Sequence, residues 1–421
     1  MHEKEGEEDE VKSIDIVHED DTYIVFQNGL RLSKPYAFDF IANVKRRWCE
    51  VENEEENNIV DIFHKEFPNL PREYYAQAFK DGRLRVEDKN ASSVSRSHKK
   101  KRKKEDDEKE YFPALVPGQT VRHLVHKHEP PVLCSENEIE ILEEVDDIVA
   151  VRKPATVPVH PTGQYRNNSV VEILRHRQRL PANTPPMLPL HRLDRNVSGL
   201  LLMAKTSEAA NIATDLIVSN KVRKEYVARV KGLFRKEAMT CEVPLGFCGK
   251  THVATWPSSS VPFSSLYKSA KTSFTLIKHF SESNESLVRC VPETGRTHQI
   301  RAHLKILGFP IANDVAYGGQ LTPEQTKQQN EYQMMCNSFA MDDKCLHQDD
   351  TSAATNDDGG DSLKWDKIKS HTECPHCPLV CWFGSRATHD LEAIYLHCVK
   401  YSFKECWTFE CLPLPKWAED K

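Results

Sequence analysis

The sequence lacks an apolar run long enough to cross a membrane, and its mostly acidic first ten residues resemble neither a secretory signal nor an arginine-rich transit peptide. It also lacks a glycine-rich motif of the kind that binds a nucleotide cofactor. Its 13 cysteines are odd in number and spread along 421 residues, which favours reduced thiols over a disulfide framework. We therefore expect no membrane contact and no cofactor, and a location in the cytoplasm, the nucleus or both.

A surplus of positive charge, typical of proteins that bind nucleic acids, is also missing, because the formal net charge is −6. The acidic residues are segregated, however. Residues 1–21 hold ten acidic and two basic side chains, and residues 342–366 hold eight and two. Both runs lack apolar periodicity and are predicted to be solvated. The remaining 53 basic and 45 acidic side chains can therefore give the folded part a positive surface that suits phosphates.

The N-terminal third shows strand-like and helical patterns in a definite order. Strands are predicted over 23–26 and 36–41, helices over 59–67 and 72–80, and a strand over 83–86. Two short helices followed by a turn and a strand resemble an S4-like RNA-binding module, completed after a basic insert by residues 117–123. We predict an acidic disordered tail 1–21, an extension 22–58, the module 59–135 with insert 87–111, and a domain 136–421 with an acidic insert at about 320–372.

Asp194 lies between two arginines in the run His191-Arg192-Leu193-Asp194-Arg195. Residues 189–193 are strand-like and Ser198-Gly199 opens a second apolar run, so Asp194 is predicted to lie on a tight loop. Such a loop suits the presentation of one ionised acid to a polyanionic substrate. The alternative is a solvated ion pair of little energetic weight.

A second segment, residues 294–304, opens with a turn marked by Gly295. Ile300, Leu304 and Leu307 follow at helical spacing and form an apolar face. The residues His298, Arg301 and Lys305 then share a polar face, which suits phosphates unless it is an ordinary solvated helix face.

A third segment, residues 224–232, alternates so that Tyr226 points inward with Ala228 and Val230. A single inward tyrosine is more often a core residue than a catalyst. A fourth segment, Lys153-Pro154-Ala155 followed by His160, by itself indicates only a strand that ends at a proline turn.

Taken together, the four segments resemble the motifs of the RluA-type pseudouridine synthases, with two departures. Val197 stands where that family usually has threonine, and Thr156 stands where glycine is usual. The resemblance implies that Asp194 is catalytic, that Tyr226 stacks on the target uracil and that Arg301 pairs with Asp194. Residues that would contact RNA are Arg192, Arg195, Arg296, His298, Lys305, Lys153 and His160.

The resemblance also implies the fold and the reaction. It predicts an α+β catalytic domain on a mostly antiparallel, bent sheet, preceded by the S4-like α/β domain. In the implied reaction the N1–C1′ bond of uridine breaks and C5 bonds to C1′, with Asp194 as nucleophile or as the base that removes the 2′ proton. Residues 126–131 and 158–174 resemble the eukaryotic branch, which includes synthases acting on tRNA uridine 32. The expected partner is RNA, either tRNA or messenger RNA, bound by a monomer.

Two other classes of function compete with this interpretation. A catalytically silent RNA-binding protein is disfavoured because the acid, tyrosine and arginine positions are all occupied. A zinc-dependent deaminase needs H-x-E followed by P-C-x-x-C, and His64-Lys65-Glu66 with Cys374 and Cys377 match this only in part. Weak candidate ligands for a structural zinc are His371, Cys374, Cys377 and Cys381, but no second spaced pair follows them, so we expect no metal.

Overall fold

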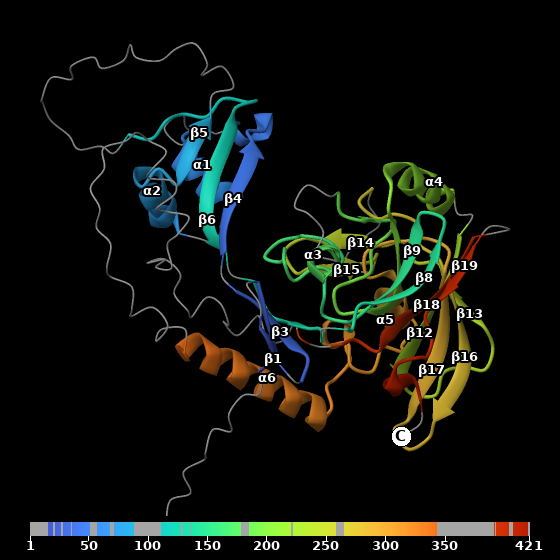
Figure 1. The fold of residues 1–421 in the computed structure, drawn as a ribbon. Coiled ribbons are helices and arrows are strands. Elements are labelled where there is room, and N and C mark those ends of the chain that lie inside the picture. Colours follow the sequence, from blue (N-terminus) through green and yellow to red (C-terminus); the bar gives the residue numbers. More distant parts are fainter. Residues whose placement is uncertain are drawn as a thin grey trace, which may run out of the picture. The chain divides into compact units, whose positions relative to one another are not determined.

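The computed structural model describes residues 16–19, 22–26, 28–34, 36–50, 57–67, 71–87, 111–127, 129–135, 137–177, 185–219, 222–257, 265–342, 391, 393–403 and 407–419. The described residues form two compact units, each with its own core (Figure 1). The smaller unit holds residues 36–127, and the larger unit holds residues 16–34, 129–342 and 391–419. The basic run 99–104 and the candidate zinc ligands lie outside the described residues.

The smaller unit packs two helices against a three-stranded antiparallel sheet of order β4-β6-β5. Its elements are β4 (Tyr36–Asn43), η1 (Arg46–Trp48), α1 (Ile59–Glu66), α2 (Arg72–Lys80), β5 (Leu84–Glu87) and β6 (Thr120–Lys127). Asn58 begins α1, because its side chain accepts hydrogen bonds from the amides of Val60 and Asp61 at 3.1 and 3.0 Å. Ile59, Ile62 and Phe63 then face the core, as their helical spacing predicts.

The expected N-terminal extension, residues 22–58, is divided between the two units. β4 pairs along its whole length with β6 of the smaller unit. β2 (Tyr23–Phe26) and β3 (Leu30–Ser33) belong to a sheet of order β1-β2-β3-β7 in the larger unit, with β1 (Ile16–Glu19) and β7 (Val132–Leu133). The prediction of a disordered tail over 1–21 is wrong for residues 16–19, because β1 pairs with β2. The partners that place β3 and β4 in different units are β7 and β6, which are distant in sequence, and therefore no local pattern shows this division.

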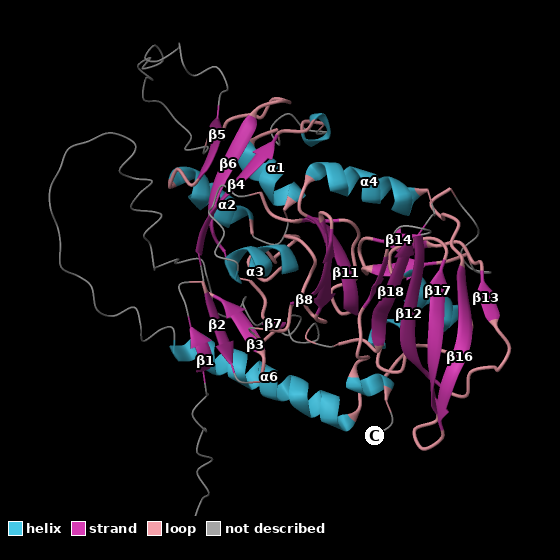
Figure 2. Cartoon of the chain, turned by 45° about the vertical axis from the view of Figure 1, so that its right-hand side comes forward, coloured by secondary structure: helices cyan, strands magenta, loops and turns pink. Residues whose placement is uncertain are grey.

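The larger unit is built on a ten-stranded sheet of order β13-β16-β17-β12-β18-β11-β9-β8, with β10 beside β11 and β19 beside β18. Figure 2 shows β11, β18, β12, β17 and β16 of this sheet side by side. The strands are β8 (Glu140–Val145), β9 (Ile148–Lys153), β10 (Leu188–Pro189), β11 (Ser198–Ala204), β12 (Val222–Lys231), β13 (Met239–Cys241), β16 (Thr272–Phe280), β17 (Glu285–Pro292), β18 (Leu396–Phe403) and β19 (Thr408–Glu410). β11 and β18 run parallel, whereas the other strand pairs described in this sheet are antiparallel. The sheet is thus mixed and mostly antiparallel, as expected.

The apolar run of β11 is explained by burial on both faces of this sheet. Leu200 and Leu202 belong to the core that includes Ala213 of α4 (Ser207–Val218) and Ile300 of α5 (Gln299–Ile306). On the other face, Leu201 and Met203 pack with residues of α3 (Val170–Arg177). A strand covered on both sides carries apolar residues without alternation.

The remaining elements are β14 (Gly246–Cys248) and β15 (Val253–Thr255), which form a two-stranded ribbon, η3 (Val315–Tyr317), α6 (Pro323–Asp342) and η5 (Lys416–Ala418). α6 differs from expectation, because the insert predicted at about 320–372 begins with a 20-residue helix. Its glutamine, glutamate and lysine residues favour helix, and Tyr332 is buried. Among the described residues, no helix is long and apolar enough to span a bilayer.

Candidate active site

Asp194 lies on a loop that leads into β11. The strand predicted over 189–193 is shorter in the structure, where Leu188–Pro189 alone pairs with β11. The chain then turns at Asp194, whose carbonyl oxygen accepts a hydrogen bond from the amide of Val197 at 3.1 Å. The acid therefore lies on a tight loop at the start of a buried strand, as the sequence predicted.

Gly199 fixes the path of the chain as it leaves this loop. It pairs in parallel register with Cys398 of β18, and a Cβ atom here would lie 2.3 Å from the carbonyl oxygen of Cys398. Its φ of +117° is also rarely adopted by L side chains. Glycine is therefore needed for β18 to approach the start of β11, one turn beyond Asp194.

Lys153 lies beneath the loop, although the family resemblance predicted that it contacts RNA. Its side chain is fully buried, and Nζ donates to the carbonyl oxygens of Pro154, Arg195 and Val197 at 2.7, 3.0 and 2.8 Å. Burial lowers the pKa of Lys153 to about 7, while three carbonyl acceptors favour the ammonium. The predicted RNA contact is therefore wrong, because Lys153 holds the Asp194 loop from inside the protein.

Replacing Lys153 with methionine should lower both stability and turnover. Methionine keeps the chain length but leaves three buried carbonyl groups without their donor, at about 1–3 kcal/mol for each unsatisfied group. The free energy of unfolding, measured in urea, should fall by several kcal/mol. The matched variant Lys205→Met, at an exposed position after β11 where Nζ makes a surface ion pair with Glu144, should change it by less than about 1 kcal/mol. Equal stability of the two variants would contradict the role given to Lys153.

Thr156 occupies a position at which the family resemblance expects glycine. The structure shows why glycine suits the position, because the φ of Thr156 is +71°. The threonine is fully buried, and its hydroxyl accepts a hydrogen bond from the amide of Leu133 at 2.7 Å. This bond offsets part of the strain of a β-branched residue in the left-handed region and ties the turn after β9 to β7.

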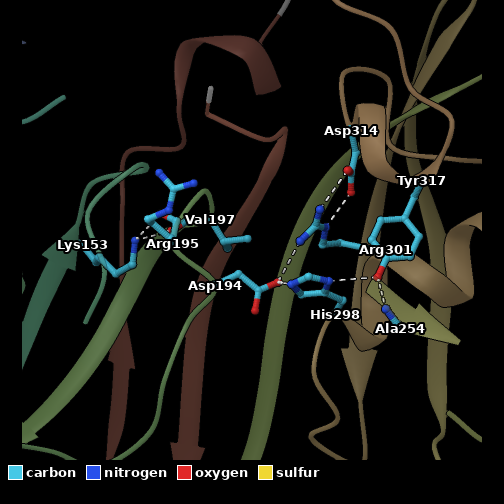
Figure 3. A network of polar contacts seen from close by, with 9 residues as sticks. All are labelled: Lys153, Asp194, Arg195, Val197, Ala254, His298, Arg301, Asp314 and Tyr317. Atoms are coloured by element: carbon cyan, nitrogen blue, oxygen red, sulfur yellow. Dashed lines mark hydrogen bonds and ion pairs between the residues drawn. The ribbon is translucent and has the colours of Figure 1, made fainter. Parts of the chain in front are cut away.

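Arg301 connects two carboxylates (Figure 3). Its Nε and Nη2 bind both oxygens of Asp314 at 2.6 and 2.9 Å, and its Nη1 lies 3.4 Å from Oδ2 of Asp194. The side chains of Arg301 and Asp314 are 8% and 2% exposed. Burial lowers the pKa of Arg301, but the hydrogen bonds and charge of Asp314 outweigh it and raise the pKa overall. Arg301 thus carries a permanent positive charge beside Asp194 and does not lie on an exposed phosphate-binding face with Lys305.

His298 is the second group that faces Asp194. Its Nε2 lies 3.7 Å from Oδ2 of Asp194, and its Nδ1 lies 2.9 Å from the hydroxyl of Tyr317. That hydroxyl also accepts a hydrogen bond from the amide of Ala254 at 2.6 Å, which leaves its own proton available to Nδ1. Burial lowers the pKa of His298 and favours the neutral ring. A neutral ring with its N–H at Nε2 directs this donor toward Asp194 and leaves Nδ1 to accept from Tyr317 (Figure 3).

Tyr226 lies at the end of a second hydrogen-bonded chain. The amide of Leu202 donates to Nε2 of His191 at 3.1 Å, and burial lowers the pKa of His191 to about 3. The neutral ring must then carry its proton on Nδ1, which lies 3.1 Å from the hydroxyl of Tyr401. The Tyr401 hydroxyl is in turn 3.4 Å from that of Tyr226, so its proton is available to Tyr226. Burial raises the pKa of Tyr226 well above its usual value, and the phenol stays protonated.

One cavity, of about 350 Å³, is lined by Asp194, Arg301, His298, Tyr226, His191 and Tyr401. Its volume is within the size range of small-molecule sites. Of the predicted residues, those that line it are Asp194, Tyr226, Arg301, Arg192, Arg296 and His298. Arg195, Lys305 and His160 do not line it. Arg195 instead donates a hydrogen bond to the hydroxyl of Tyr165 at 3.1 Å, and Lys305 and His160 are exposed elsewhere on the larger unit.

Sequence reasoning missed five residues of the site, namely His191, Lys224, Asp314, Tyr317 and Tyr401. Lys224 could have been found, because strand alternation places it on the same face of β12 as Tyr226. Asp314 and Tyr401 carry no local signal, since their partners are 13 and 210 residues away.

A carboxylate beside a buried arginine and a protonated tyrosine, around a cavity of this size, defines an enzyme site for nucleophilic or acid–base chemistry. The comparisons with known proteins identify its class. A family model described as RNA pseudouridylate synthase matches residues 147–305, which include Asp194, Tyr226 and Arg301.

Known relatives of the whole chain or of most of it show the same family. RNA pseudouridine synthase 7 of Oryza sativa subsp. japonica is 37% identical over 94% of this chain and 91% of the relative. The tRNA pseudouridine(31) synthase of Saccharomyces cerevisiae is 31% identical over 93% and 96%, and the mitochondrial tRNA pseudouridine(32) synthase of that yeast is 35% identical over 70% and 56%. The chain belongs to the RNA pseudouridine synthase family, and it is an isomerase that converts uridine to pseudouridine in RNA.

Proposed function

We propose that Asp194 is the catalytic carboxylate of this isomerase. The observation that carries the proposal is the Asp194–Arg301 contact of 3.4 Å at the wall of a cavity that also contains the Tyr226 ring. Arg301 is itself fixed by two hydrogen bonds to Asp314, so it can aim the carboxylate without moving. Asp194 then acts on the ribose of the bound uridine, either as a nucleophile or as the base that removes the 2′ proton.

The reaction exchanges one bond for another without a co-reactant. The N1–C1′ bond of uridine breaks, the uracil turns in the cavity, C5 bonds to C1′, and C5 loses a proton while N1 gains one. Tyr226 supplies an aromatic face for the uracil and a protonated hydroxyl that can relay this proton. The uridine must leave its stack first, which costs a few kcal/mol or less in an unpaired loop.

We propose tRNA as the substrate, with the anticodon-loop uridine 32 favoured over messenger RNA. Two yeast relatives support this, because they are a tRNA pseudouridine(31) synthase and a tRNA pseudouridine(32) synthase. Mapping pseudouridine in total RNA with and without the enzyme tests the proposal. A site lost from a tRNA anticodon loop is expected. Lost sites confined to messenger RNA would contradict it.

We further propose that the smaller unit binds RNA as an S4-like module. Two exposed cations of this unit lie next to each other: Lys45 precedes η1, and Arg46 is its first residue. η1 packs beside the two helices of this unit. Cationic side chains on such a unit attract phosphates and give binding a strong dependence on salt.

The variant Lys45→Glu/Arg46→Glu should weaken RNA binding more than it slows the bound reaction. Each lost phosphate contact makes the slope of log affinity against log salt shallower by about 0.7. The control is Arg235→Glu/Lys236→Glu, an equal charge change at exposed positions of the larger unit. Binding titrations over a range of salt, with single-turnover rates at saturating enzyme, measure both effects. Equal affinity of the first variant and the unaltered protein would rule out the proposed role of the smaller unit.

The competing functions make different predictions for the same assays. A silent RNA-binding protein would bind tRNA without product. A zinc deaminase would need His64 and Glu66 of α1 to lie beside the paired cysteines, which are outside the described residues. The described part of the chain contains no cluster of potential metal ligands.

A further inference from the structure

A second hollow adjoins the catalytic cavity. Its volume is about 340 Å³, and its lining consists of Leu245, Gly246, Phe247, Leu266, Lys268, Gly295, Arg296 and Thr297. The last three residues also line the catalytic cavity, so one short segment before α5 forms a shared wall. A chain molecule bound in the catalytic cavity can therefore continue into the hollow.

The hollow presents apolar surface to solvent. Phe247 is 48% exposed and Leu266 is 79% exposed, although both are large apolar side chains. Phe247 lies on β14 and pairs in register with Ala254 of β15. Its ring meets His298 edge to face, with ring centroids 5.9 Å apart, and His298 is the group that faces Asp194. An exposed phenylalanine is thus held beside the active site.

The ribbon that carries this ring is anchored by contacts that also arrange the active site. The amide of Ala254 donates to the Tyr317 hydroxyl, which bonds His298. The β14–β15 ribbon, labelled in Figure 1, is therefore tied to the group next to Asp194. An exposed aromatic ring on an anchored ribbon beside a binding cavity is a platform on which a nucleobase can stack.

The charge of the hollow suits a phosphate. Its described lining contains two cations, Lys268 and Arg296, and no acidic side chain. Arg296 donates from Nε to the carbonyl oxygen of Ser269 at 2.9 Å, which orients its guanidinium along the shared wall. Lys268 is exposed in the same hollow. An aromatic face next to cations is the combination that binds single-stranded nucleic acid.

We propose that this hollow binds the unpaired nucleotide next to the target uridine, with its base on Phe247 and its phosphate at Arg296 and Lys268. The inference rests on the proposed function, because a uridine in the catalytic cavity brings its chain neighbour to the shared wall. The hollow thereby helps to select loops in which the neighbour is unstacked.

The test compares Phe247→Ala, Phe247→Trp and the control Ile277→Ala, which removes another exposed apolar side chain, from β16. The probe is an anticodon stem-loop RNA with uridine 32, intact or with an abasic nucleotide on either side of that uridine. Phe247→Ala should weaken binding of the intact RNA by about 5- to 150-fold, the equivalent of one lost stack. Phe247→Trp should bind as the unaltered protein does, and Ile277→Ala should have little effect.

The abasic RNAs supply the decisive comparison. One of the two abasic RNAs lacks the base that would stack on Phe247. Phe247→Ala and the unaltered protein should bind that RNA with equal affinity. An equal penalty on all three RNAs would overturn the inference, and so would a change of oligomeric state in Phe247→Ala, since the hollow would then bind protein. These are binding measurements, and they test the hollow even without turnover. Failure of the unaltered enzyme to form pseudouridine would instead count against the proposed function.

Discussion

Replacing Asp194 with asparagine should abolish pseudouridine formation while RNA binding persists. Asparagine has nearly the same shape and can occupy the same loop, but it can neither attack C1′ nor accept the 2′ proton. A group that acts in the chemical step changes turnover far more than binding. We expect the single-turnover rate at saturating enzyme to fall by at least about three orders of magnitude, the scale of losing a principal catalytic group.

A matched control is available in the same unit. Asp146 is exposed on the turn between β8 and β9 and has a φ of +53°, which asparagine adopts readily. Asp146→Asn should therefore retain the rate of the unaltered enzyme. An Asp194→Asn enzyme that also turned over at that rate would show Asp194 to be no more than an ion-pair partner of Arg301.

Replacing Arg301 with methionine should have the second largest effect, because it acts on stability and turnover together. The substitution leaves the Asp314 carboxylate, 2% exposed, without its two hydrogen bonds. Removing one partner of a buried ion pair costs about 3–5 kcal/mol. Asp194 also loses the guanidinium that aims it, so the remaining folded enzyme should turn over slowly. Unfolding in urea and single-turnover kinetics measure the two losses separately.

The double variant Arg301→Met/Asp314→Asn distinguishes these losses. It removes the uncompensated buried charge, so part of the free energy of unfolding should return. Turnover should stay low, because asparagine at position 314 does not restore the contact with Asp194. Recovery of turnover together with stability would mean that Arg301 serves the fold alone.

Several elements of the site could be predicted from the sequence because their determinants are local. The apolar spacing of Ile300 and Leu304 predicts α5, and the alternation around Tyr226 predicts β12 with the tyrosine inward. The turn before Ser198-Gly199 follows from residue types whose conformational preferences are strong. Combined with the family motifs, these patterns identify Asp194, Tyr226 and Arg301 as parts of one site.

The roles of individual cations could not be predicted in this way. Arg301 and Lys305 occupy one helical face by spacing, yet Arg301 is buried against Asp314 while Lys305 is exposed. Lys153 looked like a phosphate ligand, but it is enclosed by carbonyl groups from residues up to 44 positions away. Burial depends on what covers a side chain, and the covering residues come from distant parts of the chain.

The sequence by itself therefore determined the family, the reaction class and the residues proposed to carry the chemistry, because motif order and local periodicity are properties of the linear chain. The tertiary structure alone decided which neighbours surround those residues: Asp314 behind Arg301, Tyr317 behind His298, and Tyr401 behind Tyr226. It also placed Phe247 beside the active site, and it put β3 and β4 into different units. Contacts across long sequence separations depend on sheet pairing and packing, and these are settled when the whole core forms.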